Sequence, residues 1–85
     1  MAENQSISIS KAVEIAGNHL NLLIPDAQGI KLEEAEISDD DKYWFITLGY
    51  YETTGLVNLR KYRRIKIDRN SGEVRSMKMR EPENA

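Results

Sequence analysis

The side chains that most often perform chemistry are sparse in this sequence. His19 is the only histidine among 85 residues, and there is no cysteine, so a catalytic triad and the common zinc sites lack their usual members. A histidine that serves as a general base also needs a partner to orient it and a cleft to work in. We therefore expect His19 to pack on a helix flank or to point to solvent.

Carboxylates are the other candidates for metal binding or acid–base catalysis. Residues 39–41 are three adjacent aspartates that point in different directions, whereas a calcium loop spreads its ligands over about a dozen residues. Residues 68–73 lack the late glutamate and the glycine position of such a loop, so both segments are expected to be hairpin turns. A glycosidase needs two carboxylates at a defined separation across a cleft. Nothing in the sequence places any two of Glu33, Glu34, Glu36 and Asp68 in that arrangement. The sequence thus predicts no catalytic residue, no metal, no cofactor and no enzymatic activity.

The positive charge of the chain is concentrated in one segment. Residues 1–59 carry three lysines against ten carboxylates, a net charge of −7, whereas residues 60–80 carry nine basic residues against two carboxylates, a net charge of +7. The basic residues are Arg60, Lys61, Arg63, Arg64, Lys66, Arg69, Arg75, Lys78 and Arg80. The overall net charge of −2 argues against bulk attraction to nucleic acid, yet a local basic patch remains compatible with it.

Three interpretations of this basic segment stay open. The basic strands could lie beside acidic ones, with their charges paired across the sheet. They could bind an acidic protein surface or a second copy of the chain. Together with Tyr50, Tyr51 and Tyr62 they could instead hold single-stranded nucleic acid by phosphate pairing and base stacking. Side chains alternate between the two faces of a strand, which halves the charge that any one ligand meets.

Length and composition indicate one soluble domain. Residues 1–85 suffice for a single small core, with frayed ends expected at about 1–7 and 81–85. The longest apolar run is far short of the roughly 20 residues that span a bilayer, and residues 1–9 do not resemble a secretory signal. We therefore expect a cytoplasmic protein that does not associate with membranes.

The elements that must position these residues can be located by periodicity. Ser10 is the expected N-cap of a helix over about 11–24, which Pro25 ends. Its apolar stripe is Val13, Ala16, Leu20, Leu23 and Ile24. Strands are predicted over 30–38, which we place at a sheet edge, over 43–51 and somewhere within 56–68, with a last strand that contains Val74, Met77 and Met79. Residues 52–55 are expected to interrupt the strands and residues 70–72 to form a tight turn. Val74 and Met77 are three residues apart, so a bulge or a twist is expected between them.

This order predicts an α+β fold, with one N-terminal helix packed on a four-stranded antiparallel sheet. Trp44, Ile46 and Leu48 share one face of their strand and are expected to lie beneath the helix. The opposite face then faces solvent or a partner. It is unusually aromatic for a solvated surface, so we predict a partner-binding site there, formed by Tyr43, Phe45, Tyr51, Tyr62, Arg64 and Lys66.

Three segments resemble the PepSY-like arrangement within the cystatin-like folds, in which a curved antiparallel sheet grips a helix. They are KAVEIAGNHL at 11–20, KYWFITLGY at 42–50 and YRRIKIDRNSGEV at 62–74, and the closing hairpin at 67–74 is the most specific of them. The resemblance covers about 70 of the 85 residues and implies a small non-catalytic module that binds or restrains another protein.

The functional prediction follows from these observations together. We expect a non-enzymatic protein-interaction or regulatory module that binds through the outer sheet face or a strand edge. Self-association into a homodimer is a further expectation, because the core of so small a chain is limited. The alternative is single-stranded nucleic-acid binding through the basic C-terminal hairpin, which the acidic overall charge disfavours.

Overall fold

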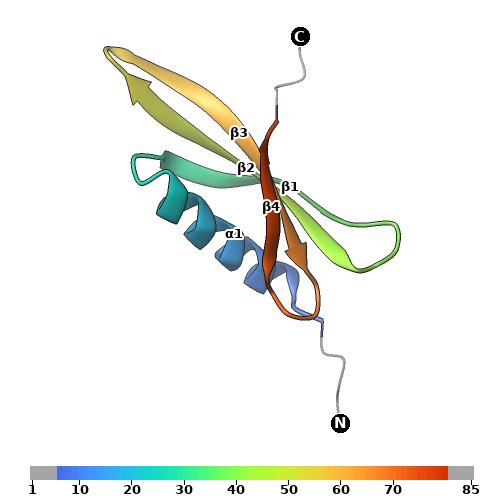
Figure 1. The fold of residues 1–85 in the computed structure, drawn as a ribbon. Helices are drawn as coiled ribbons and strands as arrows, with labels where there is room; N and C mark the ends of the chain where they lie inside the picture. Colours follow the sequence, from blue (N-terminus) through green and yellow to red (C-terminus); the bar gives the residue numbers. More distant parts are fainter. Residues whose placement is uncertain (1–5, 81–85) are drawn as a thin grey trace.

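A four-stranded antiparallel sheet with one helix on one of its faces forms the body of the protein (Figure 1). The computed structural model describes residues 6–80, apart from the side chain of residue 54. The elements are α1 (Ile9–Leu23), β1 (Gln28–Ile37), β2 (Tyr43–Thr54), β3 (Val57–Asp68) and β4 (Val74–Met79), and the strands lie in the order β1-β2-β3-β4. The predicted α+β arrangement is confirmed, and β1 is an edge strand as expected.

Helix α1 begins earlier than predicted, because Ser8 and not Ser10 is its N-cap. The Ser8 hydroxyl accepts a hydrogen bond from the backbone N–H of Lys11 at 3.1 Å, which satisfies one of the free amides of the first turn. The helix ends at Leu23, before Pro25, and the N–H of residue 24 donates to the carbonyl of Leu20.

The buried stripe of α1 is narrower than its apolar sequence suggests. Only Ala12, Ala16 and Leu20 are fully buried, at a spacing of four residues. Leu23 belongs to the predicted stripe, yet it is 54 % exposed. Leu22, beside the predicted stripe, is 75 % exposed. The helix therefore contacts the sheet through one narrow row of side chains, and Leu22 and Leu23 lie outside that contact.

The core lies between α1 and the inner face of β2 and β3. Trp44, Ile46 and Leu48 are buried beneath the helix as predicted, together with Ile65 and Ile67 on the neighbouring strand. Tyr50, which the sequence groups with the basic segment, belongs to this core as well: it is fully buried, and its hydroxyl accepts a hydrogen bond from Nε of Arg63 at 3.1 Å. The outer face therefore keeps Tyr51 and Tyr62 but not Tyr50.

The central hairpin is longer than predicted, because residues 52–54 continue β2. Glu52 pairs with Leu59 and Thr53 with Asn58, and the turn lies farther along, at Gly55 and Leu56. Gly55 takes a φ of 64°, a conformation that suits a two-residue hairpin turn. The end of this hairpin projects past the rest of the sheet (Figure 1). Because neither face of the strands is buried there, the sequence need not alternate between apolar and polar residues.

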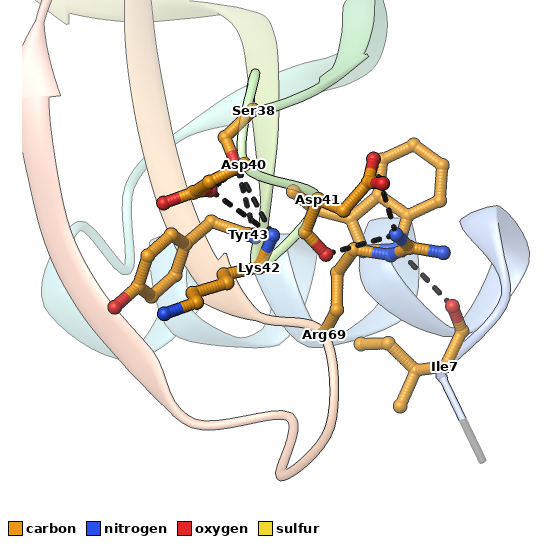
Figure 2. A network of polar contacts seen from close by, with 8 residues as sticks. Ile7, Ser38, Asp40, Asp41, Lys42, Tyr43 and Arg69 are labelled. Atoms are coloured by element: carbon orange, nitrogen blue, oxygen red, sulfur yellow. Dashed lines mark hydrogen bonds and ion pairs between the residues drawn. The ribbon is translucent and has the colours of Figure 1, made fainter. Parts of the chain in front are cut away.

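The two turns at the other end of the sheet lie against each other and against the segment before α1 (Figure 2). Nη1 of Arg69 donates to the carbonyl of Asp41 at 3.0 Å, and its guanidinium carbon lies 5.8 Å from the centroid of the Trp44 ring. The indole Nε1 of Trp44 donates to the carbonyl of Ile7 at 3.1 Å. Residues 39–41 are exposed in a hairpin turn, as predicted.

Asp68 organises the β3–β4 turn. Its carboxylate accepts hydrogen bonds from the backbone N–H groups of Asn70 at 2.8 Å and Ser71 at 3.0 Å, and Gly72 follows with a φ of 78°. The predicted turn is thus confirmed. So is the predicted bulge, because the register of β3 against β4 shifts between Lys66 and Ile67.

Acid is expected to weaken this turn. The N–H donors of Ser71 and Asn70, with a smaller contribution from Arg75, lower the pKa of Asp68 against the opposing effect of burial. A folded-state pKa below the unfolded value of about 3.9 means that the ionised carboxylate stabilises the fold above that pH. This contribution is lost as the pH falls from about 4 through the folded-state pKa. Urea unfolding from pH 7 down to pH 2 measures the loss.

The matched variants for this measurement are Asp68→Asn and Asp39→Asn. The amide side chain introduced by Asp68→Asn keeps an oxygen that accepts the two backbone hydrogen bonds but does not titrate, so the unfolding free energy of this variant should fall less steeply below pH 4. Asp39→Asn makes the same change of charge at an exposed position of the β1–β2 turn and serves as the control. An equal pH dependence in all three proteins would contradict this role of Asp68.

Candidate partner-binding surface

The outer face of the sheet, which points away from α1, brings all six predicted binding residues together. In the register of β2 against β3, Phe45 lies opposite Lys66 and Tyr51 lies opposite Arg60. Tyr43, Tyr62 and Arg64 occupy the same face, because they are even-numbered steps away along their strands. The alternation in the sequence was therefore sufficient to place these side chains on one surface.

Basic side chains cover the aromatic rings of this face. The guanidinium carbon of Arg64 lies 4.4 Å from the ring centroid of Phe45, and Nζ of Lys66 lies 4.3 Å from that of Tyr43. Arg60 lies 5.0 Å from the ring of Tyr51 and 5.3 Å from that of Tyr62. These are cation–π distances. Tyr51 is 42 % exposed and the other five predicted residues are half-buried, so the surface offers cations above rings and not bare rings.

Part of the basic segment pairs with acidic residues of β1, which supports the charge-pairing interpretation for those side chains. Arg64 lies 3.5 Å from the carboxylate of Glu36, and Arg80 forms an ion pair with Glu34 across the face at 2.5 Å. Arg60 pairs with Glu33 above Gly49 of β2. A Cβ at Gly49 would lie 2.7 Å from both charged groups, so the missing side chain leaves room for this pair.

A pocket of about 500 Å³ opens on the outer face over β2, β3 and β4. Four of its six lining residues are cations, and the lining is completed by one aromatic and one hydroxyl side chain: Phe45, Arg64, Lys66, Arg75, Ser76 and Lys78. Arg75 pairs with Asp68 at 3.3 Å and with Glu73 at 3.5 Å. Its hydrogen bond to Asp68 raises the pKa of the Arg75 guanidinium above its ordinary value. Among residues 6–80, no carboxylate lies within 4.0 Å of Nζ of Lys66 or Lys78.

Three members of this pocket were not among the predicted binding residues. Arg75, Ser76 and Lys78 belong to β4, whose register depends on the bulge beside Ile67. Ser76 lies opposite Lys66, and Lys78 lies opposite Arg64. The sequence shows the charge of Arg75 and Lys78, but only the strand register and its bulge show that β4 joins the same surface as Phe45.

The candidate catalytic groups of the sequence do not converge on one site. His19 lies half-buried on α1, on the other side of the sheet from the pocket. Glu33, Glu34 and Glu36 each pair with a different arginine. Within residues 6–80, no cluster of three or more histidine, aspartate or glutamate side chains could hold a metal ion. In the same part of the chain, no helix has the length and apolar character needed to cross a membrane.

Comparisons with known proteins bear on the expected family. No family model matches the chain, and neither does any curated protein or any solved structure. The structure itself establishes the α+β arrangement, whereas membership of the PepSY-like or cystatin-like proteins stays a prediction.

Proposed function

We propose that this chain is a non-enzymatic interaction module, which binds or restrains another protein through the outer face of its sheet. The observation that carries the proposal is the pocket over β2–β4, where four cations surround Phe45. The pocket brings an aromatic ring and four cations from three strands together on one surface. Edge strand β4 borders the pocket, so an extended partner segment could also pair with its backbone.

The residues of the face suit the two requirements of a protein interface. Tyr51 and Tyr62 supply amphipathic contact area, and arginine and tyrosine are enriched among the residues that contribute most to binding. Arg64 and Lys66 supply positive charge that steers an acidic partner and sets its orientation. The cation–π contacts hold these long side chains over the rings, so less side-chain entropy remains to be lost on binding.

Single-stranded nucleic acid remains the alternative ligand, because the same four cations could contact phosphates. Base stacking needs an accessible ring face, and the rings of Tyr43, Phe45, Tyr51 and Tyr62 are each covered by a cation. This arrangement favours a protein partner.

The proposal predicts that reversing two charges of the face removes partner binding. In affinity capture from the native host, the Arg64→Glu/Lys66→Glu protein is expected to recover its partner at least tenfold less than wild type, a loss of about 1.4 kcal/mol or more. The reason is that both cations become like charges to an acidic surface. Quantitative mass spectrometry of the eluates measures the recovery.

The matched control is Lys11→Glu/Lys42→Glu, which changes the net charge equally at exposed positions outside the face. It should retain the partner. Recovery of an untagged copy of this chain would identify self-association, which light scattering at micromolar concentration then measures directly. A partner that both double variants retain equally would refute the assignment to the outer face.

A further inference from the structure

We propose that the pocket over β2–β4 recognises two carboxylates of an extended acidic segment, at positions i and i+2 of the partner. This inference rests on the proposed function and adds the chemistry of the ligand. The occupant is a short peptide segment of the type acid–x–acid, with carboxylate side chains that enter the pocket from solvent.

The lining residues form two neighbouring rows across the strands. One row is Phe45, Lys66 and Ser76, and the next contains Arg64 and Lys78 opposite each other. Residues two apart on a strand lie roughly 7 Å apart along it. The alternate side chains of an extended peptide have the same separation, so one carboxylate can meet each row.

Each row offers a cation that the fold leaves available. In the described part of the chain, Lys66 and Lys78 have no carboxylate within 4.0 Å, and one lies in each row. Arg64 and Arg75 have exposed partners, Glu36 and Glu73, at 3.5 Å, so an incoming carboxylate can share their N–H groups. The Ser76 hydroxyl adds a donor next to Lys66.

The surroundings of the pocket favour a short acidic peptide over a polyanion. Glu34 and Glu36 of β1 lie on the same face and would repel a nucleic-acid strand that continues past the pocket, since it carries a charge at every phosphate. A short segment whose two carboxylates are held by Lys66 and Lys78 brings fewer negative charges near Glu34 and Glu36. The covered ring of Phe45 provides an apolar floor but no free face for a base.

The test is a titration of the full chain, labelled with ¹⁵N, with capped heptapeptides that contain Glu-Ser-Glu, Gln-Ser-Gln or Glu-Ser-Ser-Ser-Glu. Glu-Ser-Glu is expected to shift the amide signals of Phe45, Lys66, Ser76 and Lys78 in a saturable way, with a dissociation constant on the order of 1 mM or below. Gln-Ser-Gln should bind at least tenfold more weakly, and the wider spacing at least threefold more weakly, because only one row is then engaged.

Variants and other anions complete the design. Lys66→Gln/Lys78→Gln should weaken Glu-Ser-Glu binding at least tenfold, whereas Lys11→Gln/Lys42→Gln, with the same loss of charge, should leave it unchanged. Oligothymidylate and inorganic phosphate are titrated in parallel. Tighter binding of oligothymidylate than of Glu-Ser-Glu, equal binding of the glutamate and glutamine peptides, or no saturable shift would each overturn the inference.

These outcomes separate the inference from the function on which it rests. A partner whose capture requires Arg64 and Lys66, combined with no peptide binding at the pocket, leaves the proposed function standing and refutes the acidic-segment ligand. Peptide binding at the pocket, combined with a captured partner that is indifferent to those residues, refutes the proposed function instead.

Discussion

Replacing Leu20 with alanine is expected to lower the free energy of unfolding by about 3 kcal/mol. Leu20 is fully buried, and it is the only large side chain of α1 that is, since Ala12 and Ala16 are the other two buried positions. Its loss leaves a cavity between the helix and the sheet that the two alanines cannot fill. Urea unfolding followed by the fluorescence of Trp44, the single tryptophan, measures the change.

Leu22→Ala is the matched control for this prediction. It removes the same atoms from the same helix at a position that is 75 % exposed, and it should change stability by no more than about 0.5 kcal/mol. If Leu20→Ala proves too unstable to fold, Leu20→Val should still show a loss of about 1 kcal/mol. Equal effects at the two positions would mean that α1 does not pack on the sheet through Leu20.

The fold was predictable because two periodicities are clear in the sequence. Strand β2 alternates so strongly that Trp44, Ile46 and Leu48 could be placed beneath the helix, as the structure confirms. The helix was located but its stripe was drawn too wide, since hydrophobicity alone does not distinguish Leu20 from Leu23. That distinction depends on where the helix leaves the sheet, which is a property of the tertiary contact.

Local sequence patterns do not predict where the hairpin of β2 and β3 ends. Glu52 and Thr53 look like a turn, because polar residues crowd there without alternation. In the structure they continue the ladder, and Glu52 forms an ion pair with Lys61 at 3.0 Å. An exposed arm gains its stability from backbone pairing and cross-strand pairs, and neither leaves a hydrophobic pattern in the sequence.

The candidate site was predictable only as a set of residues on one face. Strand alternation placed Tyr43, Phe45 and Arg64 together, but it cannot show that Arg64 lies over the ring of Phe45. The contribution of β4 could not be predicted, for another reason. The bulge opposite Lys66 and Ile67 shifts the register by one residue, and this shift decides which side chains of β4 face outward. The pocket depends on that register.

Replacing Tyr50 with alanine is the second large effect that we expect, a loss of about 4 kcal/mol in the free energy of unfolding. Tyr50 is among the largest fully buried side chains, it lies on the helix side of β2, and its hydroxyl holds Nε of Arg63 at 3.1 Å. Truncation removes the ring from the core and also removes the acceptor of that hydrogen bond. The same urea unfolding experiment applies, because Trp44 is retained.

The neighbouring residue supplies the control, since consecutive residues of a strand face opposite ways. Tyr51 is 42 % exposed on the outer face, so Tyr51→Ala should cost well under half as much as Tyr50→Ala. Tyr50→Phe keeps the ring and should cost about 1 kcal/mol, the contribution of one hydrogen bond. A greater loss for Tyr51→Ala than for Tyr50→Ala would mean that the faces of β2 are exchanged, and the outer surface on which the proposed function rests would then be the core.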